Sequence, residues 1–84
     1  MPEVTIYTTP YCPYCQMAKG LLKKKNVAFN EIDVSDTTKR SAMRTKAAGR
    51  NTVPQIFIGN AHVGGCDDIH ALEAQGKLDG LLTA

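Results

Sequence analysis

A strand pattern ends and a helix pattern begins within a few residues near the start of the chain, and this junction constrains the fold most. Segment 4–7 is rich in β-branched and aromatic residues, which favour a strand, and Pro10 closes it. Pro13 suits the first turn of a helix, and apolar residues then recur at helical spacing to about Lys25. A second strand reached across such a helix should run parallel to the first, with a right-handed crossover.

The remaining patterns predict three more strands and two more helices. Alternation favours a second strand at 27–34, and capping residues precede a second helix at about 37–48 that Gly49 ends. The two-residue turn Gly59-Asn60 predicts a hairpin between strands 53–58 and 61–63, before a last helix interrupted near Gly76. The expected order is β-α-β-α-β-β-α, an α/β fold with a mixed four-stranded sheet flanked by helices.

Composition narrows the class of protein. The 84 residues predict a single domain, 1–84, and the apolar fraction of 43% with 21% charged residues is that of an ordinary globular protein. The chain has no apolar run long enough for a membrane span and no export signal at its start, so we expect a cytosolic protein. A net charge of +2 gives no argument for nucleic acid as a partner.

Charge is nevertheless uneven along the chain. A stretch without acidic residues is interpreted as a solvated helix face, or as a surface that helps attract an anionic ligand; its basic residues are Lys39, Arg40, Arg44, Lys46 and Arg50.

Two of the three cysteines form the motif Cys12-Pro13-Tyr14-Cys15 at the strand–helix junction. Unpaired N–H groups and the positive end of the helix dipole stabilise a thiolate there, so Cys12 is the predicted nucleophile. Attack on a disulfide sulfur forms a mixed disulfide, which Cys15, one turn further along, can resolve. The motif therefore predicts thiol–disulfide exchange.

The same Cys-x-x-Cys spacing also opens zinc sites, which need two further ligands. His62, Cys66 and His70 are the available residues, and none forms a second closely spaced pair, so we predict no metal. The two histidines are expected on the surface without a role. Cys66 is interpreted as an inert, half-buried thiol, with a regulatory or secondary redox thiol as the alternative.

Two residues near the cysteines have open interpretations. Tyr14 either packs on the helix or lines a groove beside the Cys12 sulfur, and we favour the groove because the first turn after an active thiol is usually exposed. Pro54 is either a strand-start proline or follows a cis Val53–Pro54 bond, which would turn the Val53 backbone groups towards an extended peptide.

The segment from Gly64 to Asp68 predicts a turn that enters a helix N-terminus. Exposed N–H groups there can bind a carboxylate, and the Asp67 side chain can bind an ammonium. Together these two functions suit the α-amino-acid end of a γ-glutamyl group. The alternative is that Asp67 or Asp68 only caps the helix.

These segments together resemble the glutaredoxin family, in particular its small bacterial glutaredoxin-3 type. The resemblance covers essentially the whole chain. It rests on Ile6-Tyr7-Thr8, Cys12-Pro13-Tyr14-Cys15, Thr52-Val53-Pro54-Gln55-Ile56-Phe57-Ile58 and Gly64-Gly65-Cys66-Asp67-Asp68.

The resemblance implies a thioredoxin-like fold, a cis Pro54, and glutathione lying along Thr52 and Val53. The γ-glutamyl end would be held by Cys66 and Asp67. With Tyr14, Pro54 and Gly65 from the same motifs, the expected glutathione-binding residues are Tyr14, Thr52, Val53, Pro54, Gly65, Cys66 and Asp67.

The resemblance also implies the reaction and its partners. Cys12 alone would reduce glutathione mixed disulfides, and Cys12 with Cys15 would reduce protein disulfides. Glutathione would be the reducing co-substrate, with no bound cofactor. Expected partners are disulfide-containing or glutathionylated cytosolic proteins, such as ribonucleotide reductase, and the chain itself is expected to be a monomer.

One feature departs from the family pattern, and two rival functions stay open. Many glutaredoxins carry a lysine shortly before the first cysteine, and segment 8–11 has none. We expect Arg44, Lys46 or Arg50 to replace that cation in part.

The rivals are a glutaredoxin-like protein reduced by thioredoxin reductase and a carrier of a glutathione-ligated iron–sulfur cluster. The Cys66-Asp67 pair argues against the first, and Pro13 with Cys15 argues against the second.

Overall fold

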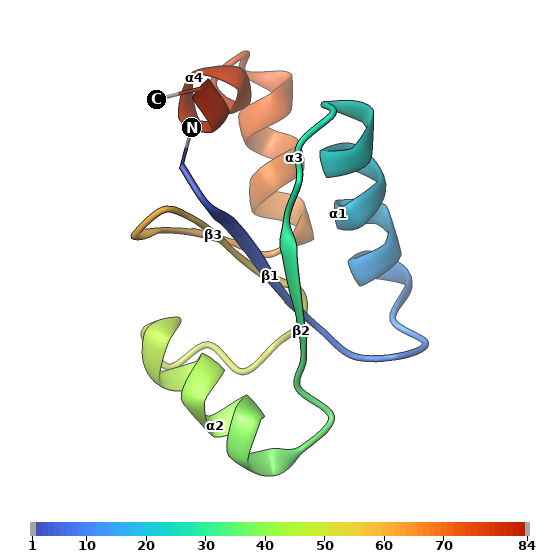
Figure 1. Cartoon of the computed structure of the whole chain (residues 1–84), viewed down its shortest axis with the longest axis vertical. Helices are drawn as coiled ribbons and strands as arrows, with labels where there is room; N and C mark the ends of the chain where they lie inside the picture. The colour runs from blue at the N-terminus through green and yellow to red at the C-terminus, as the bar shows by residue number, and fades with distance from the viewer. Residues whose placement is uncertain (1, 84) are drawn as a thin grey trace.

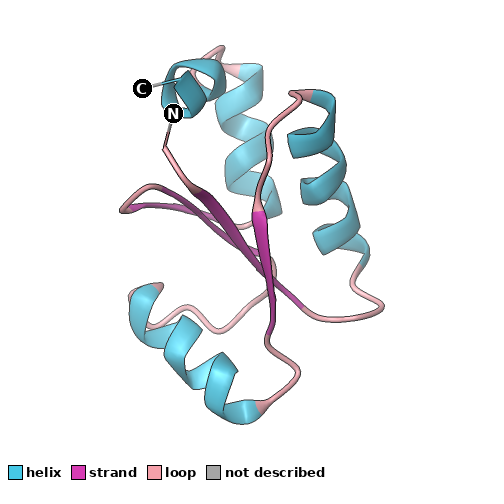
Figure 2. Cartoon of the chain, viewed as in Figure 1, coloured by secondary structure: helices cyan, strands magenta, loops and turns pink. Residues whose placement is uncertain are grey.

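The computed structural model describes residues 2–83, so the first and last residues of the predicted domain 1–84 lie outside the described part. Strands and helices alternate as the sequence predicts, with one additional helix at the end (Figures 1 and 2). The elements are β1 (Val4–Thr8), α1 (Pro13–Lys24), β2 (Asn30–Asp33), α2 (Thr37–Lys46), β3 (Gln55–Ile58), β4 (Ala61–Gly64), α3 (Cys66–Ala74) and α4 (Leu78–Thr83).

The four strands form one mixed sheet in the order β2-β1-β3-β4. β1 runs parallel to β2 across the α1 connection and antiparallel to β3, which pairs with β4 as a hairpin. The mixed four-stranded sheet predicted from the sequence is therefore confirmed. The last pair of the β1–β3 ladder joins Tyr7 to Gln55, so the residues just before Gln55 lie beyond that ladder.

Two apolar cores of unequal size lie on opposite faces of the sheet. The larger core packs α1, α3 and α4 against β1 and β3, with Ile6, Leu22 and Ile69 among its fully buried members. The smaller core sets Met43 of α2 against Tyr7 and Val34. Figure 1 shows α1 and α3 side by side and α2 set apart from them.

Two boundaries differ from the sequence prediction for clear local reasons. The second strand begins at Asn30 instead of residue 27, because the Val27 N–H still bonds to the Leu22 carbonyl at the end of α1 (3.1 Å). The last helix is two helices, because Gly76 adopts a φ of +71°, a left-handed conformation that glycine reaches without strain. Val27 and Phe29 still pack against the larger core, so their apolar pattern reports burial outside a strand.

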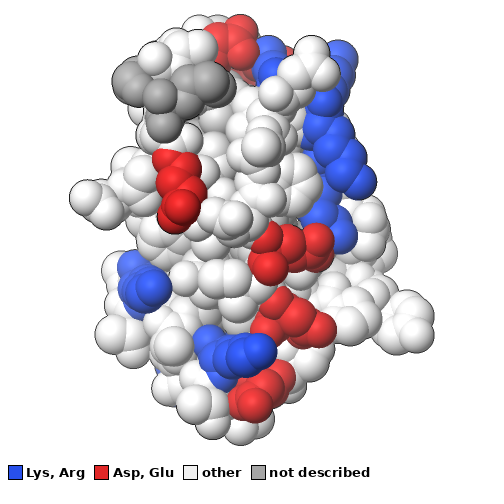
Figure 3. Space-filling view, viewed as in Figure 1, with Lys and Arg blue, Asp and Glu red and all other residues white. Residues whose placement is uncertain are grey.

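Charged side chains are unevenly distributed over the surface. Lys and Arg side chains gather along α1, whereas Asp and Glu side chains lie over β2 (Figure 3), and the Lys19–Glu31 ion pair joins them at 3.0 Å. Within residues 2–83, no helix combines the length and the apolar character that a membrane span requires.

Candidate active site

Cys12 is the N-cap residue of α1, in the extended conformation typical of that position. Its sulfur accepts a hydrogen bond from the Cys15 N–H at 3.2 Å, so the thiol takes the place that a serine or aspartate oxygen has in an ordinary helix cap. The Cys12 Sγ also lies 4.0 Å from the Val53 carbonyl oxygen. The partly exposed sulfur is therefore held between a helix N-terminus and the segment that precedes β3.

Cys15 lies one turn further into α1 and is fully buried. Burial, together with a hydrogen bond to Cys12, raises the pKa of the Cys15 thiol to about 12. Both thiols are free, and at neutral pH Cys15 is protonated. The pair thus combines an accessible sulfur with a shielded one, as an attacking and a resolving thiol require.

A groove of about 270 Å³ begins beside these cysteines. All seven residues predicted to bind glutathione line it, and the full lining is Tyr14, Arg50, Thr52, Val53, Pro54, Gly65, Cys66, Asp67 and Asp68. The structure thus brings Tyr14 to the groove, as favoured above. The Val53–Pro54 bond is cis, which confirms the expectation drawn from the family resemblance.

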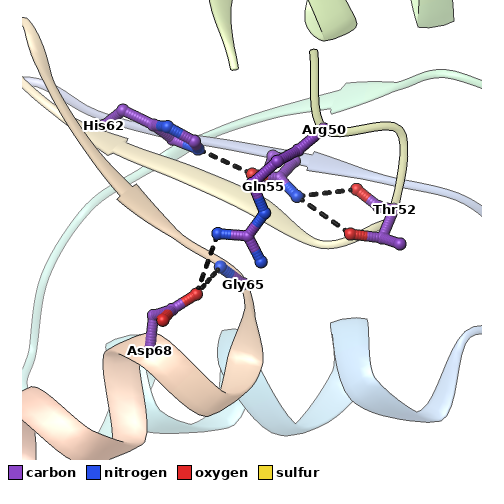
Figure 4. Close-up of polar contacts among 6 residues, drawn as sticks. All are labelled: Arg50, Thr52, Gln55, His62, Gly65 and Asp68. Atoms are coloured by element: carbon purple, nitrogen blue, oxygen red, sulfur yellow. Dashed lines mark hydrogen bonds and ion pairs between the residues drawn. The ribbon is translucent and has the colours of Figure 1, made fainter. Parts of the chain in front are cut away.

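The N-terminus of α3 forms the far end of the groove. The Asp68 carboxylate accepts the Gly65 N–H at 2.8 Å and the Arg50 guanidinium at 3.1 Å (Figure 4). These contacts, the backbone N–H first, hold the pKa of Asp68 below its usual value. Asp68 therefore makes the capping contact, from the first turn of α3 to the N-cap residue Gly65, and Asp67 is exposed and lines the groove.

Gly64 makes this close arrangement possible. Its φ is +118°, and a Cβ at this position would collide with the Asp68 carboxylate and lie 2.8 Å from Arg50 Nη1. Only glycine therefore allows the side chains of Arg50 and Asp68 to meet over the chain at this turn.

Arg50 is the one of the three candidate cations that lines this groove. Lys46 instead donates to the Tyr7 hydroxyl at 3.5 Å, on the face of the sheet that α2 covers. Arg44 is exposed on α2 and is not part of the groove lining. The structure thus separates three residues that the sequence left equivalent.

The third cysteine, predicted to be half-buried, is buried, and the two histidines are more buried than the predicted surface positions. Cys66 is buried at the start of α3, and burial raises the pKa of its thiol, with a further contribution from the charge of Asp67. The prediction that both histidines lie free on the surface is wrong: both are half-buried, and His62 contacts Gln55. Within residues 2–83, no three His, Cys, Asp or Glu side chains cluster as metal ligands.

One buried polar residue of this region escaped the sequence reasoning. Gln55 is fully buried at the start of β3, where its amide bonds Thr52 and His62 (Figure 4). A polar side chain in an otherwise apolar strand must find partners when it is buried. That signal was available in the sequence, whereas the identity of the partners was not.

Comparison with known proteins places this geometry in a family. The glutaredoxin family model matches residues 4–63. Glutaredoxin 3 of Escherichia coli K12 is 50% identical over 82 residues, covering 98% of this chain and 99% of its own. The solution structure of a Brucella melitensis glutaredoxin is 59% identical, with a TM-score of 0.86 over 98% of this chain and 89% of that one.

A more distant solved structure is a buckwheat glutaredoxin in complex with glutathione. It is 29% identical and has a TM-score of 0.89, over 98% of this chain and 77% of that chain. The chain therefore belongs to the glutaredoxin family, and the predicted thioredoxin-like fold is confirmed. Glutaredoxins are thiol–disulfide oxidoreductases, and this chain has the vicinal cysteines Cys12 and Cys15 at the start of α1.

Proposed function

We propose that this glutaredoxin uses glutathione, and that it reduces glutathione mixed disulfides and protein disulfides. One observation carries the proposal: a single groove connects the Val53 segment, 4.0 Å from the Cys12 sulfur, with the N-terminus of α3. The buckwheat glutaredoxin of the same fold, whose structure is a complex with glutathione, supports it.

The groove offers groups that match a γ-glutamyl tripeptide. Val53 lies beyond the β1–β3 ladder, so that ladder does not use its backbone groups. The N–H groups at the start of α3 suit a carboxylate, and the exposed Asp67 suits the α-ammonium. Arg50 lines the groove, and a guanidinium has five N–H donors, more than its contact with Asp68 uses. It would give the groove the cation that segment 8–11 lacks.

The single-thiol reaction needs only Cys12. Its thiolate attacks the glutathione sulfur of a mixed disulfide, the protein thiolate leaves, and Cys12 becomes joined to glutathione. The thiolate of a second glutathione then attacks that glutathione sulfur, forming oxidised glutathione and restoring the Cys12 thiolate. Over one cycle, the mixed disulfide and one glutathione thiol become the protein thiol and oxidised glutathione.

The two-thiol reaction adds Cys15. After Cys12 has formed a mixed disulfide with a protein, the Cys15 thiol loses its proton to water and attacks the Cys12 sulfur, so that a Cys12–Cys15 disulfide forms and the substrate thiolate leaves. Two glutathione thiols then reduce this disulfide and are released as oxidised glutathione. After burial, the hydrogen bond that the Cys15 thiol donates to Cys12 and the charge of Cys12 both raise the pKa of Cys15 in the reduced protein. Both influences end once Cys12 is in a disulfide, so Cys15 becomes easier to ionise at the step that needs it.

Protein substrates would meet an apolar surface around the thiol. Tyr11, Tyr14 and Met17 are the large apolar side chains with the greatest exposure among the described residues, at 100%, 60% and 53%. They flank Cys12 in the sequence and on the first turns of α1. This surface suits docking of disulfide-containing or glutathionylated cytosolic proteins, ribonucleotide reductase among them.

The test compares two mixed disulfides of one peptide, one carrying glutathione and one carrying cysteine. We expect kcat/KM to be about tenfold higher for the glutathione form, the effect of roughly one charge-assisted contact. Arg50→Ala should raise KM for the glutathione form several-fold, whereas the control Arg44→Ala should leave it unchanged. Equal turnover of both disulfides would contradict the proposal, and turnover supported only by thioredoxin reductase would favour the rival function.

A further inference from the structure

The buried side chain of Gln55 connects the groove to a residue outside it. Its Nε2 donates to the Thr52 carbonyl at 3.0 Å and to the Thr52 hydroxyl at 3.1 Å. Its Oε1 lies 2.7 Å from His62 Nε2 on β4 (Figure 4). All the polar atoms of a fully buried amide are thus satisfied, which is the condition for burying one at low cost.

These contacts determine which nitrogen of His62 carries a hydrogen. Both amide hydrogens of Gln55 are used on Thr52, so the oxygen must face His62, and an amide oxygen can only accept. His62 Nε2 is therefore the donor. The ring is held a second way, because it stacks on Phe57 with centroids 4.8 Å apart and planes at 23°. The β3–β4 register places these two residues opposite each other.

The segment at the other end of this chain of contacts lacks support from the sheet. Thr52 and Val53 line the groove, and both precede β3, whose ladder with β1 ends at Gln55. The Gln55 side chain is what bonds the Thr52 carbonyl and hydroxyl. The next carbonyl along, that of Val53, lies 4.0 Å from the Cys12 sulfur.

We propose that His62, acting through Gln55, is a positioning residue that holds Thr52 and Val53 in the orientation in which the groove receives glutathione. This inference rests on the glutathione groove proposed above. His62 is not among the residues that line the groove. Its donor N–H fixes the Gln55 amide, and the amide in turn fixes the backbone turn beside the thiol.

Two substitutions separate the donor from the ring. His62→Phe keeps an aromatic ring against Phe57 and removes the N–H, whereas His62→Gln has an amide N–H the same number of bonds from the backbone. We expect His62→Phe to raise KM for a glutathionylated peptide about fivefold, the effect of one neutral hydrogen bond. kcat should stay near wild type, and His62→Gln should restore KM to within about twofold.

Two controls separate positioning from a general structural effect. Iodoacetamide needs no glutathione site, and the Cys12 sulfur accepts its closest hydrogen bond from the Cys15 N–H on α1, so the alkylation rate of Cys12 should stay close to wild type in both variants. The ¹⁵N NMR spectrum of wild-type His62 should show a protonated Nε2 and an unprotonated Nδ1 in the neutral ring. The opposite tautomer would overturn the proposal without any reference to glutathione, and so independently of whether His62→Phe folds.

The kinetic outcomes also distinguish the two proposals. A wild-type preference for the glutathione mixed disulfide, with unchanged KM in His62→Phe, overturns the positioning role and leaves the glutathione function standing. Raised KM in both His62→Phe and His62→Gln, with lowered thermal stability in both, also overturns it, because His62 would then act by packing alone. A wild type without preference for glutathione overturns both proposals.

Discussion

The starts of α1 and α3 make an instructive comparison, because each helix has a cysteine at its N-terminus and only one of these is placed to react. At α1 the Cys12 sulfur itself accepts the N–H of Cys15, and the first turn holds no acidic residue. At α3 the contact is reversed: the carboxylate of Asp68, in the first turn, accepts the N–H of the N-cap residue Gly65, and Cys66 is buried beside it.

The difference shows that a cysteine at a helix N-terminus gains from the helix only when its sulfur accepts an N–H and no carboxylate lies beside it. The N–H groups of the helix end favour negative charge, whether on sulfur or on oxygen. At α3 burial raises the pKa of the Cys66 thiol, and the charge of the neighbouring Asp67 raises it further. The free N–H groups of that helix are left to a ligand in the groove.

The largest expected consequence is in the reactivity of the three thiols. The thiolate is the form that iodoacetamide alkylates, and the pKa of both Cys15 and Cys66 is raised. At pH 7 we expect Cys12 to react at least about 100-fold faster than either, as followed by mass spectrometry of the alkylated peptides. Alkylation of Cys66 at the rate of Cys12 would contradict the claim that only the cysteine at the start of α1 is placed to react.

A methyl group at Gly64 should disrupt the contacts of Asp68 and Arg50 at the N-terminus of α3. Gly64→Ala places a Cβ against Asp68 and Arg50 at a φ of +118°. Backbone strain and the displaced contacts should together lower the free energy of unfolding by more than about 2 kcal/mol, measured in urea. Gly49→Ala is the matched control, because its φ is +90° with no atom within 4 Å, and it should show the strain alone. Equal losses in both variants would contradict the account.

Removing the charge of Asp68 should have a smaller effect that depends on pH. Because the Gly65 N–H and Arg50 hold its pKa below the usual 3.8, the ionised form stabilises the folded state. Asp68→Asn should cost about 1 kcal/mol above pH 5, the difference between a charged and a neutral acceptor. The difference should disappear as pH falls below 3.8 through the lowered pKa. Denaturation from pH 2 to 7 measures it, and a pH-independent difference would contradict the capping role.

The neighbouring carboxylate should behave in the opposite way. Asp67 is exposed, so Asp67→Asn should change the free energy of unfolding by less than about 0.5 kcal/mol. It should raise KM for a glutathionylated peptide about threefold, the value of a partly exposed charge contact. A loss of stability like that of Asp68→Asn, with unchanged KM, would reverse the roles of the two residues.

Much of the fold was predictable because its signals are local. The strand before Pro10, the helix after Pro13 and the Gly59-Asn60 hairpin each follow from short patterns, and the crossover rule then orders the strands. The division of the last helix into α3 and α4 was visible in the sequence only as an interruption near Gly76. The late start of β2 depends on a bond between Val27 and Leu22, which alternation does not report.

The residues of the site likewise differ in whether local sequence signals identify them. Cys12 and Cys15 were identifiable because their spacing and their place at a helix start are both local. Which aspartate caps α3 was not, because the choice depends on Arg50, eighteen positions before Asp68.

The three-residue chain through Gln55 was missed for a related reason. Its partners, Thr52 and His62, come from the loop before β3 and from β4. Burial of a lone polar residue could have prompted a search for partners, but their identity comes only from the folded register.

The most direct test of the central claim, that Cys12 performs a glutathione-dependent exchange which Cys15 only extends, is turnover of a glutathione mixed disulfide. Consumption of NADPH through glutathione reductase would be followed for wild type, Cys12→Ser and Cys15→Ser. The account predicts that activity is lost without Cys12 and kept without Cys15. Loss of activity in Cys15→Ser, or turnover that persists in Cys12→Ser, would contradict it.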